Sequence, residues 1–124
     1  MPYVDDIYLG NPNLKKANTE IEFTQEQILE FVKCKDDPVY FAKKYIKIVS
    51  LDEGLVPFDL YPFQEKLIRN FHEERFNICK MPRQTGKSTT CVSYLLHYAL
   101  FNDNVNIAVL ANKASTARDL LGRL

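Results

Sequence analysis

The sequence lacks three features that mark secreted and membrane proteins: paired cysteines, a basic leader and a long apolar run. Its cysteines, Cys34, Cys79 and Cys91, form no C-x-x-C pair and have no nearby histidine at ligand spacing, so neither a disulfide framework nor a zinc site is indicated. No apolar stretch approaches the roughly 20 residues that cross a bilayer, and the N-terminus carries no signal-peptide pattern. We therefore expect a reducing cytosol, no secretion and no membrane partner.

An excess of charge of one sign is also absent, because 16 Lys and Arg balance 16 Asp and Glu over the 124 residues. The balance hides an asymmetry between the halves. Residues 1–62 hold 7 basic against 11 acidic side chains, whereas residues 63–124 hold 9 against 5. A net charge of zero therefore does not exclude a nucleic-acid partner, and the two halves are predicted to be different functional units.

The first half is predicted to contain an arm and two short helices. Residues 1–20 are rich in Asn, Pro and Gly with scattered apolar side chains, which predicts an extended N-terminal arm. Residues 21–60 are predicted to form a helical N-terminal subdomain, with one helix capped by Thr24 and a second capped by Asp37. Residues 49–59 predict a loop or a short extended segment.

The second half alternates between helical and strand patterns. Helical spacing of apolar residues predicts helices over 61–74, 91–101 and 115–124. Short apolar runs predict buried strands over 76–81 and 104–111. This alternation is typical of the start of a parallel α/β sheet.

Residues 81–88 match the phosphate-loop motif G-x-x-x-x-G-K-[ST] at every fixed position but the first, where Met81 replaces glycine. Backbone N–H groups at a helix start cradle phosphate oxygens, and Gly86 has no Cβ to block that approach. Lys87 would place its charge on the β- and γ-phosphates, and Ser88 would offer a hydroxyl to Mg²⁺. The expected nucleotide-binding residues of this loop are Arg83, Gln84, Thr85, Gly86, Lys87, Ser88 and Thr89.

The same residues are also compatible with an ordinary helix start. In that interpretation Ser88 or Thr89 caps the helix and Gly86 ends the preceding strand. The predicted strand before the loop and the long predicted helix after it favour the phosphate loop.

Tyr61 and Gln64, at the start of the preceding helix, suggest an adenine pocket. A glutamine amide both donates and accepts, which is the pairing that the N7 and N6 edge of adenine needs, and the Tyr61 ring could cover the base. Taken alone, Gln64 is better explained as a solvated amide on the helix surface, and Tyr61 and Phe63 are better explained by core packing. Their position upstream of a phosphate loop favours nucleotide binding.

These motifs together resemble the ATPase domain of large terminase subunits, the DNA-packaging motors of T4-like tailed bacteriophages. The resemblance rests on Tyr61–Gln64, the deviant Walker A loop Met81–Thr89 and the Ala111–Ser115 turn, and extends upstream to Asn11–Asn18 and Cys34–Ala42. It implies an α/β fold, the start of a P-loop NTPase (RecA/helicase-like) parallel sheet preceded by a small helical segment. Residues 61–124 would then be the first part of an incomplete ATPase domain.

The resemblance also implies roles for individual residues. Such terminases carry an arginine in the loop, so Arg83 is expected to be a catalytic finger on the γ-phosphate, acting beside Lys87. A loop cation held by a local carboxylate is the alternative for Arg83. Lys113, after the second predicted strand, would couple nucleotide to DNA. ATP and Mg²⁺ are the implied cofactors.

The implied parent protein hydrolyses ATP to move double-stranded DNA into the prohead and cuts concatemeric DNA with a separate nuclease domain. Its implied partners are DNA, the small terminase subunit, the portal protein and further copies in a ring, in the cytoplasm of an infected bacterial host while transiently docked on the prohead. The Walker B aspartate and catalytic glutamate are not found here, so we expect a truncated chain that is inactive alone. The alternatives are a fragment of a superfamily-two helicase or restriction translocase, and a non-catalytic nucleotide-binding or interaction module.

The two histidines, His72 and His97, fall on predicted helices without a second ligand-type residue nearby. They are predicted to be surface or groove residues and not catalytic ones.

Overall fold

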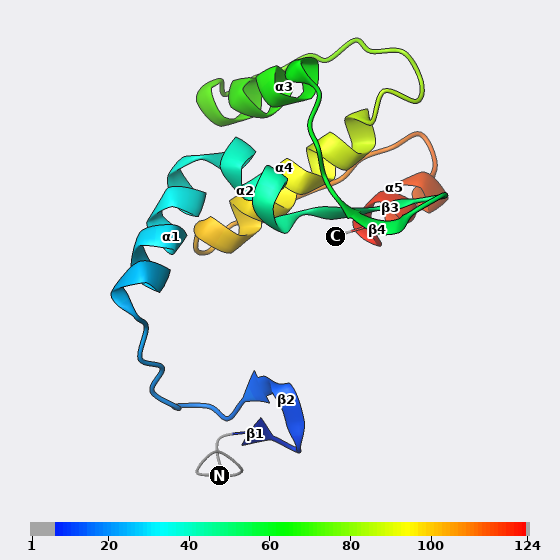
Figure 1. Ribbon diagram of the computed structural model, residues 1–124. Helices are drawn as coiled ribbons and strands as arrows, with labels where there is room; N and C mark the ends of the chain where they lie inside the picture. Colours follow the sequence, from blue (N-terminus) through cyan, green and yellow to red (C-terminus); the bar gives the residue numbers. More distant parts are fainter. Residues whose placement is uncertain (1–6, 124) are drawn as a thin grey trace.

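The computed structural model describes residues 7–123, so the first six residues of the expected arm lie outside the described part. Two antiparallel hairpins and five helices follow one another along this part of the chain (Figure 1). The strands are β1 (Ile7–Tyr8), β2 (Asn11–Lys15), β3 (Lys47–Ser50) and β4 (Gly54–Pro57). The helices are α1 (Gln25–Asp36), α2 (Pro38–Tyr45), α3 (Pro62–Glu73), α4 (Lys87–Phe101) and α5 (Ala114–Leu121).

The expected arm contains a short hairpin. Tyr8 pairs with Asn11, and the two residues between them, Leu9 and Gly10, have φ angles of 50° and 75°. Two consecutive positive φ angles are typical of the tight turn that joins antiparallel strands. Figure 1 shows this hairpin apart from the helices, joined to them by an extended segment.

The two predicted helix starts are confirmed. The Thr24 hydroxyl accepts a hydrogen bond from the Gln27 N–H at 3.3 Å, and the Gln27 side chain accepts one from the Thr24 N–H at 3.0 Å. Asp37 accepts from the N–H groups of Val39 and Tyr40 at 3.0 and 3.1 Å, which begins α2. These caps satisfy helix donors that would otherwise lack partners, so the local sequence alone determines where both helices begin.

The segment 49–59, predicted as a loop or a short extended segment, largely belongs to a second hairpin. Strands β3 and β4 pair from Lys47 with Pro57 to Ser50 with Gly54. Ile48 and Val56 face each other across the pair and both are half-buried, whereas Val49 is exposed. This alternation places one face of the hairpin against the body of the protein.

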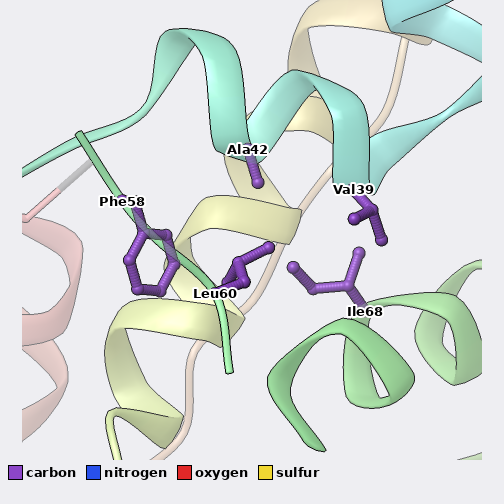
Figure 2. Packing of buried hydrophobic residues seen from close by; sticks show 5 residues of the cluster. All are labelled: Val39, Ala42, Phe58, Leu60 and Ile68. Atoms are coloured by element: carbon purple, nitrogen blue, oxygen red, sulfur yellow. The ribbon is translucent and has the colours of Figure 1, made fainter. Parts of the chain in front are cut away.

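The core lies between α2, α3 and the segment that leads from β4 into α3. Figure 2 shows Val39 and Ala42 of α2, Phe58 and Leu60 of the segment, and Ile68 of α3. Ala42 and Ile68 are fully buried. Because this cluster joins residues from both predicted ranges, 21–60 and 61–124 pack as one body around a shared core.

Helix α4 runs through the middle of the molecule and contacts α2, α3 and α5 (Figure 1). Its His97, predicted as a surface or groove residue, is only 2% exposed, so a surface position is wrong, although the ring lines a cavity of about 290 Å³. The His97 Nε2 donates to the Cys34 carbonyl at 2.8 Å, and burial lowers the pKa of the ring. Within residues 7–123, no helix is both long and apolar enough to cross a membrane.

The two predicted strands, 76–81 and 104–111, have irregular, non-helical backbone. Within the described residues neither segment pairs with another, and the side chains of Phe76, Ile78 and Leu110 are exposed. A parallel strand gains its hydrogen bonds and its burial from neighbouring strands and covering helices, and the described strands form only antiparallel hairpins. The parallel sheet therefore remains a prediction.

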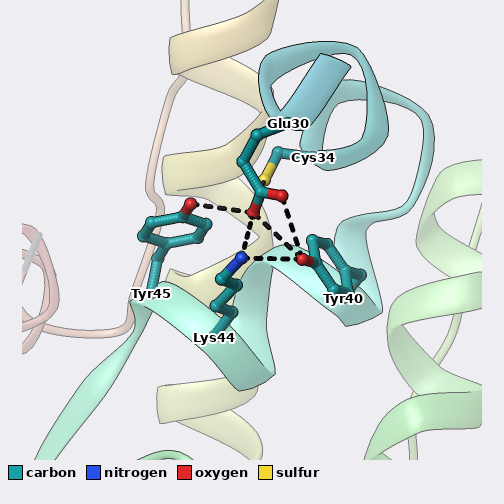
Figure 3. Close-up of polar contacts among 5 residues, drawn as sticks. All are labelled: Glu30, Cys34, Tyr40, Lys44 and Tyr45. Atoms are coloured by element: carbon teal, nitrogen blue, oxygen red, sulfur yellow. Dashed lines mark hydrogen bonds and ion pairs between the residues drawn. The ribbon is translucent and has the colours of Figure 1, made fainter. Parts of the chain in front are cut away.

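A polar network centred on Glu30 holds α1 against α2 (Figure 3). The Glu30 carboxylate accepts hydrogen bonds from Lys44 at 2.6 Å, from Tyr45 at 2.8 Å and from Tyr40 at 3.0 Å. The bonds from Lys44, then from Tyr45, lower the pKa of Glu30 to about 2. Because the pKa of this carboxyl is lower when folded than when unfolded, its stabilising effect is present above pH 4.5 and is lost as pH falls toward 2.

Glu30→Gln is therefore expected to lower the melting temperature at neutral pH, since an uncharged amide binds the Lys44 ammonium less strongly. The variant should also lose less stability than the wild type between pH 4.5 and 2. Thermal unfolding across this pH range measures both effects. Glu53→Gln, at an exposed carboxylate in the turn between β3 and β4, is the control and should follow the wild type. A Glu30→Gln profile that also follows the wild type would contradict the account.

Candidate nucleotide-binding site

The phosphate loop leads directly into α4 through a left-handed glycine. Gly86 is the N-cap of α4 with φ 71°, and its carbonyl accepts from the Thr90 N–H at 2.9 Å and from the Thr90 hydroxyl at 2.8 Å. No side chain caps this helix start. The alternative in which Ser88 or Thr89 caps the helix is therefore wrong, and the first N–H groups of α4 have no side-chain acceptor, as an anion site requires.

Two side chains form hydrogen bonds to backbone carbonyls within the loop. The Thr85 hydroxyl donates to the Pro82 carbonyl at 3.0 Å, and the Lys87 ammonium donates to the Met81 carbonyl at 3.4 Å. The positive φ angles of the loop fall at Gln84 and Gly86, not at Met81. The first motif position therefore has no left-handed backbone here, which explains why methionine can replace glycine.

Gln64 joins the start of α3 to the loop. Its side chain is 3% exposed; Oε1 accepts from the Tyr61 N–H at 2.9 Å, and Nε2 donates to the Thr85 carbonyl at 3.1 Å. A Cβ at Gly86 would lie 2.6 Å from the same Nε2, so a larger residue there would have to displace the Gln64 amide from its bond to the loop. One N–H and one lone pair of the amide remain for a ligand, and adenine reading by Gln64 stays a prediction.

A cavity of about 570 Å³ lies beside the loop and brings together most of the residues predicted to hold the nucleotide. It opens between the start of α3, the loop and the β3–β4 hairpin. Tyr61 and Phe63 stack at its side, with ring centroids 5.8 Å apart and planes 6° from parallel. The lining residues are Ile48, Val56, Pro57, Phe58, Asp59, Tyr61, Phe63, Gln64, Gln84, Thr85, Gly86 and Thr89. An aromatic and apolar wall with few polar groups suits a base.

A second cavity of about 250 Å³ lies at the start of α4. Its lining residues are Arg83, Gln84, Thr85, Gly86, Lys87, Ser88, Thr89 and Arg123. Among the described residues that line it, three are cations and none is a carboxylate. The two cavities share Gln84, Thr85, Gly86 and Thr89, so they adjoin one another. A cationic pocket at a helix N-terminus suits phosphate groups.

Lys113, predicted to couple nucleotide to DNA, does not line either of these two cavities as described. It is the N-cap of α5, and its side chain is exposed.

The sequence did not predict four of the lining residues: Ile48, Val56, Asp59 and Arg123. The first three lie in or next to the β3–β4 hairpin, most of which the sequence predicts as a loop or a short extended segment, and no motif marks Arg123.

The donor set of the smaller cavity fits magnesium only together with phosphate. Ser88 supplies a hydroxyl in the first turn of α4, and residues 7–123 contain no group of three His, Cys, Asp or Glu side chains placed to hold a metal. Mg²⁺ prefers oxygen ligands and is commonly held by one or two protein oxygens plus substrate phosphates. Nearby, burial raises the pKa of the Cys91 thiol, which keeps it uncharged beside the loop.

No model of a known protein family matches this sequence. The assignment of the site therefore rests on the loop motif, its geometry and the charge of the cavity at α4. Each of these can be tested on the chain itself.

Gly86→Ala is expected to destabilise the protein more than Gly54→Ala. Both glycines have a positive φ, 71° and 75°, so both substitutions carry the cost of a left-handed alanine, about 1–2 kcal/mol. Only at Gly86 would the new Cβ meet another group, the Gln64 amide, whereas nothing lies within 4 Å at Gly54. Urea unfolding measures the difference, and Gln64→Ala should reduce the extra cost at Gly86. Equal losses at the two glycines would show that Gln64 does not press against the loop.

Proposed function

We propose that this chain binds ATP at the loop 81–89 and belongs to the ATPase of a DNA-packaging motor of the large-terminase kind. The observation that carries the proposal is the uncapped start of α4, which opens from left-handed Gly86 into a cavity whose described lining is cationic and holds no carboxylate. Such a helix start attracts the multiple negative charges of a nucleotide's phosphates.

The phosphates would occupy the smaller cavity. The first N–H groups of α4 donate to phosphate oxygens, and Lys87 exchanges its long bond to the Met81 carbonyl for a stronger one to phosphate. The Ser88 hydroxyl would hold Mg²⁺, which supplies charge compensation on the β- and γ-phosphates. Thr89 borders both cavities and can donate to a phosphate oxygen.

The base would occupy the adjoining larger cavity. Stacked Tyr61 and Phe63 offer an aromatic side to it, and Ile48 and Val56 supply apolar contacts from the hairpin. Gln64 keeps its bonds to Tyr61 and Thr85 and turns its remaining N–H and lone pair to adenine. In this arrangement one amide connects the base to the loop that holds the phosphates.

We assign ATP hydrolysis to the full-length motor. Arg83 lies in the wall of the phosphate cavity, where a guanidinium stabilises charge that develops during phosphoryl transfer. Further carboxylates of the motor would orient the attacking water. Lys113, at the start of α5, would carry the nucleotide state toward DNA.

The partners and the cellular location that we propose also follow from the resemblance to large terminases. The motor would move double-stranded DNA through phosphate contacts that carry no sequence preference, as a ring of copies docked on the portal of a prohead. The small terminase subunit would be a further partner, and the bacterial cytoplasm the place of action.

Lys87→Ala is expected to weaken binding of ATP with Mg²⁺ by about tenfold or more, because it removes a charge-assisted hydrogen bond worth about 1.5–3 kcal/mol. Isothermal titration calorimetry on the whole chain measures this loss. Lys80→Ala is the matched control, since Lys80 is exposed and lies outside the described lining of both cavities. Equal affinities of Lys87→Ala and the wild type would reject the proposed function.

Gln64→Ala is expected to weaken ATP more than GTP. Both nucleotides should bind less well because the loop loses its bond to α3, and ATP should lose a further contact at N6 and N7. Competition between the two nucleotides on wild type and variant measures the ratio. An equal loss of affinity for ATP and GTP would show that Gln64 only supports the loop, and it would reject recognition of adenine by Gln64.

A further inference from the structure

Arg123 lies at the phosphate cavity although it is far from the loop in sequence. It follows Gly122, the C-cap of α5. The Gly122 N–H donates to the Arg118 carbonyl at 2.9 Å and the Arg123 N–H donates to the Leu120 carbonyl at 3.2 Å, so both residues are bonded to the last turn of the helix. Helix α5 contacts α4. Arg123 lines the same cavity as Lys87, Ser88 and Thr89, the first residues of α4. Arg123 also lines a neighbouring cavity together with Ile48 and Val49 of β3.

The charges around the cavity favour an anion between them. Arg83 and Lys87 come from the loop and the start of α4, and Arg123 comes from the end of α5. The positive end of the α4 dipole adds to these charges. Since no carboxylate lies among the described lining residues, a bound anion with several charges would compensate all of them at once.

We propose that Arg123 is a second arginine contact to the terminal phosphates of the bound nucleotide, supplied by α5. The inference rests on the proposed function and adds a residue that lies outside the loop motif. A guanidinium offers a planar pair of donors that matches two phosphate oxygens. Helix α5 begins next to Lys113, so a bond from phosphate to Arg123 would link the nucleotide to the position of α5.

The test compares Arg123→Ala, Arg123→Lys and Arg118→Ala in the whole chain. Arg118 lies on α5, is exposed and is absent from the described lining of the cavity, which makes it the matched control. Calorimetry with ATP, ADP and adenosine, each with Mg²⁺, should show about a tenfold loss for ATP in Arg123→Ala. The loss should shrink with fewer phosphates and vanish for adenosine. Arg123→Lys should retain part of the ATP affinity, and Arg118→Ala should match the wild type.

Two other readouts separate this role from a structural one. The melting temperature without nucleotide should be the same for Arg123→Ala and Arg118→Ala. A similar loss for ATP and adenosine, or unchanged ATP binding in Arg123→Ala while Lys87→Ala loses it, would overturn the inference and leave the proposed function standing. Unchanged ATP binding in Lys87→Ala would overturn both.

Discussion

The hydrogen bonds of the Gln64 side chain are the constraint on which the site depends. One amide accepts from the start of α3 and donates to the Thr85 carbonyl of the loop, in a position where it is almost fully buried. A buried amide left without partners would cost about 1–3 kcal/mol, so α3 and the loop are held together. Gly86 has a left-handed backbone, and a Cβ there would lie 2.6 Å from the Gln64 Nε2, so another residue at the start of α4 would be strained and would have to displace this amide.

The rest of the fold holds in place both elements that Gln64 connects, α3 and the loop. The core between α2 and α3 fixes the helix that carries Gln64, because Ile68 of that helix is fully buried among Val39, Ala42 and Leu60. On the other side, α4 passes through the centre of the molecule and directs its uncapped start toward the cationic cavity. Rigid packing behind the loop therefore holds its donors in place before a ligand arrives.

Local signals in the sequence predicted the features that depend on neighbours along the chain. The caps at Thr24 and Asp37 and the loop before α4 are of this kind, since each requires only a few consecutive residues. The β3–β4 hairpin was missed because its pairing depends on contacts across strands, where a short alternation of residues is a weak signal. Arg123 and buried His97 were missed for a related reason: only the packing of α4 against other helices brings them where they lie.

The most direct test of the central claim is a titration of the ¹⁵N-labelled chain with ATP and Mg²⁺, followed by the amide signals in NMR spectra. If phosphates bind at the start of α4, the backbone amides of Gly86, Lys87 and Ser88 and the side-chain amide of Gln64 will show the largest shifts, and inorganic triphosphate will shift the same backbone amides. Shifts confined to other parts of the chain, such as the polar network around Glu30, or no shifts in the loop at all, would contradict the account.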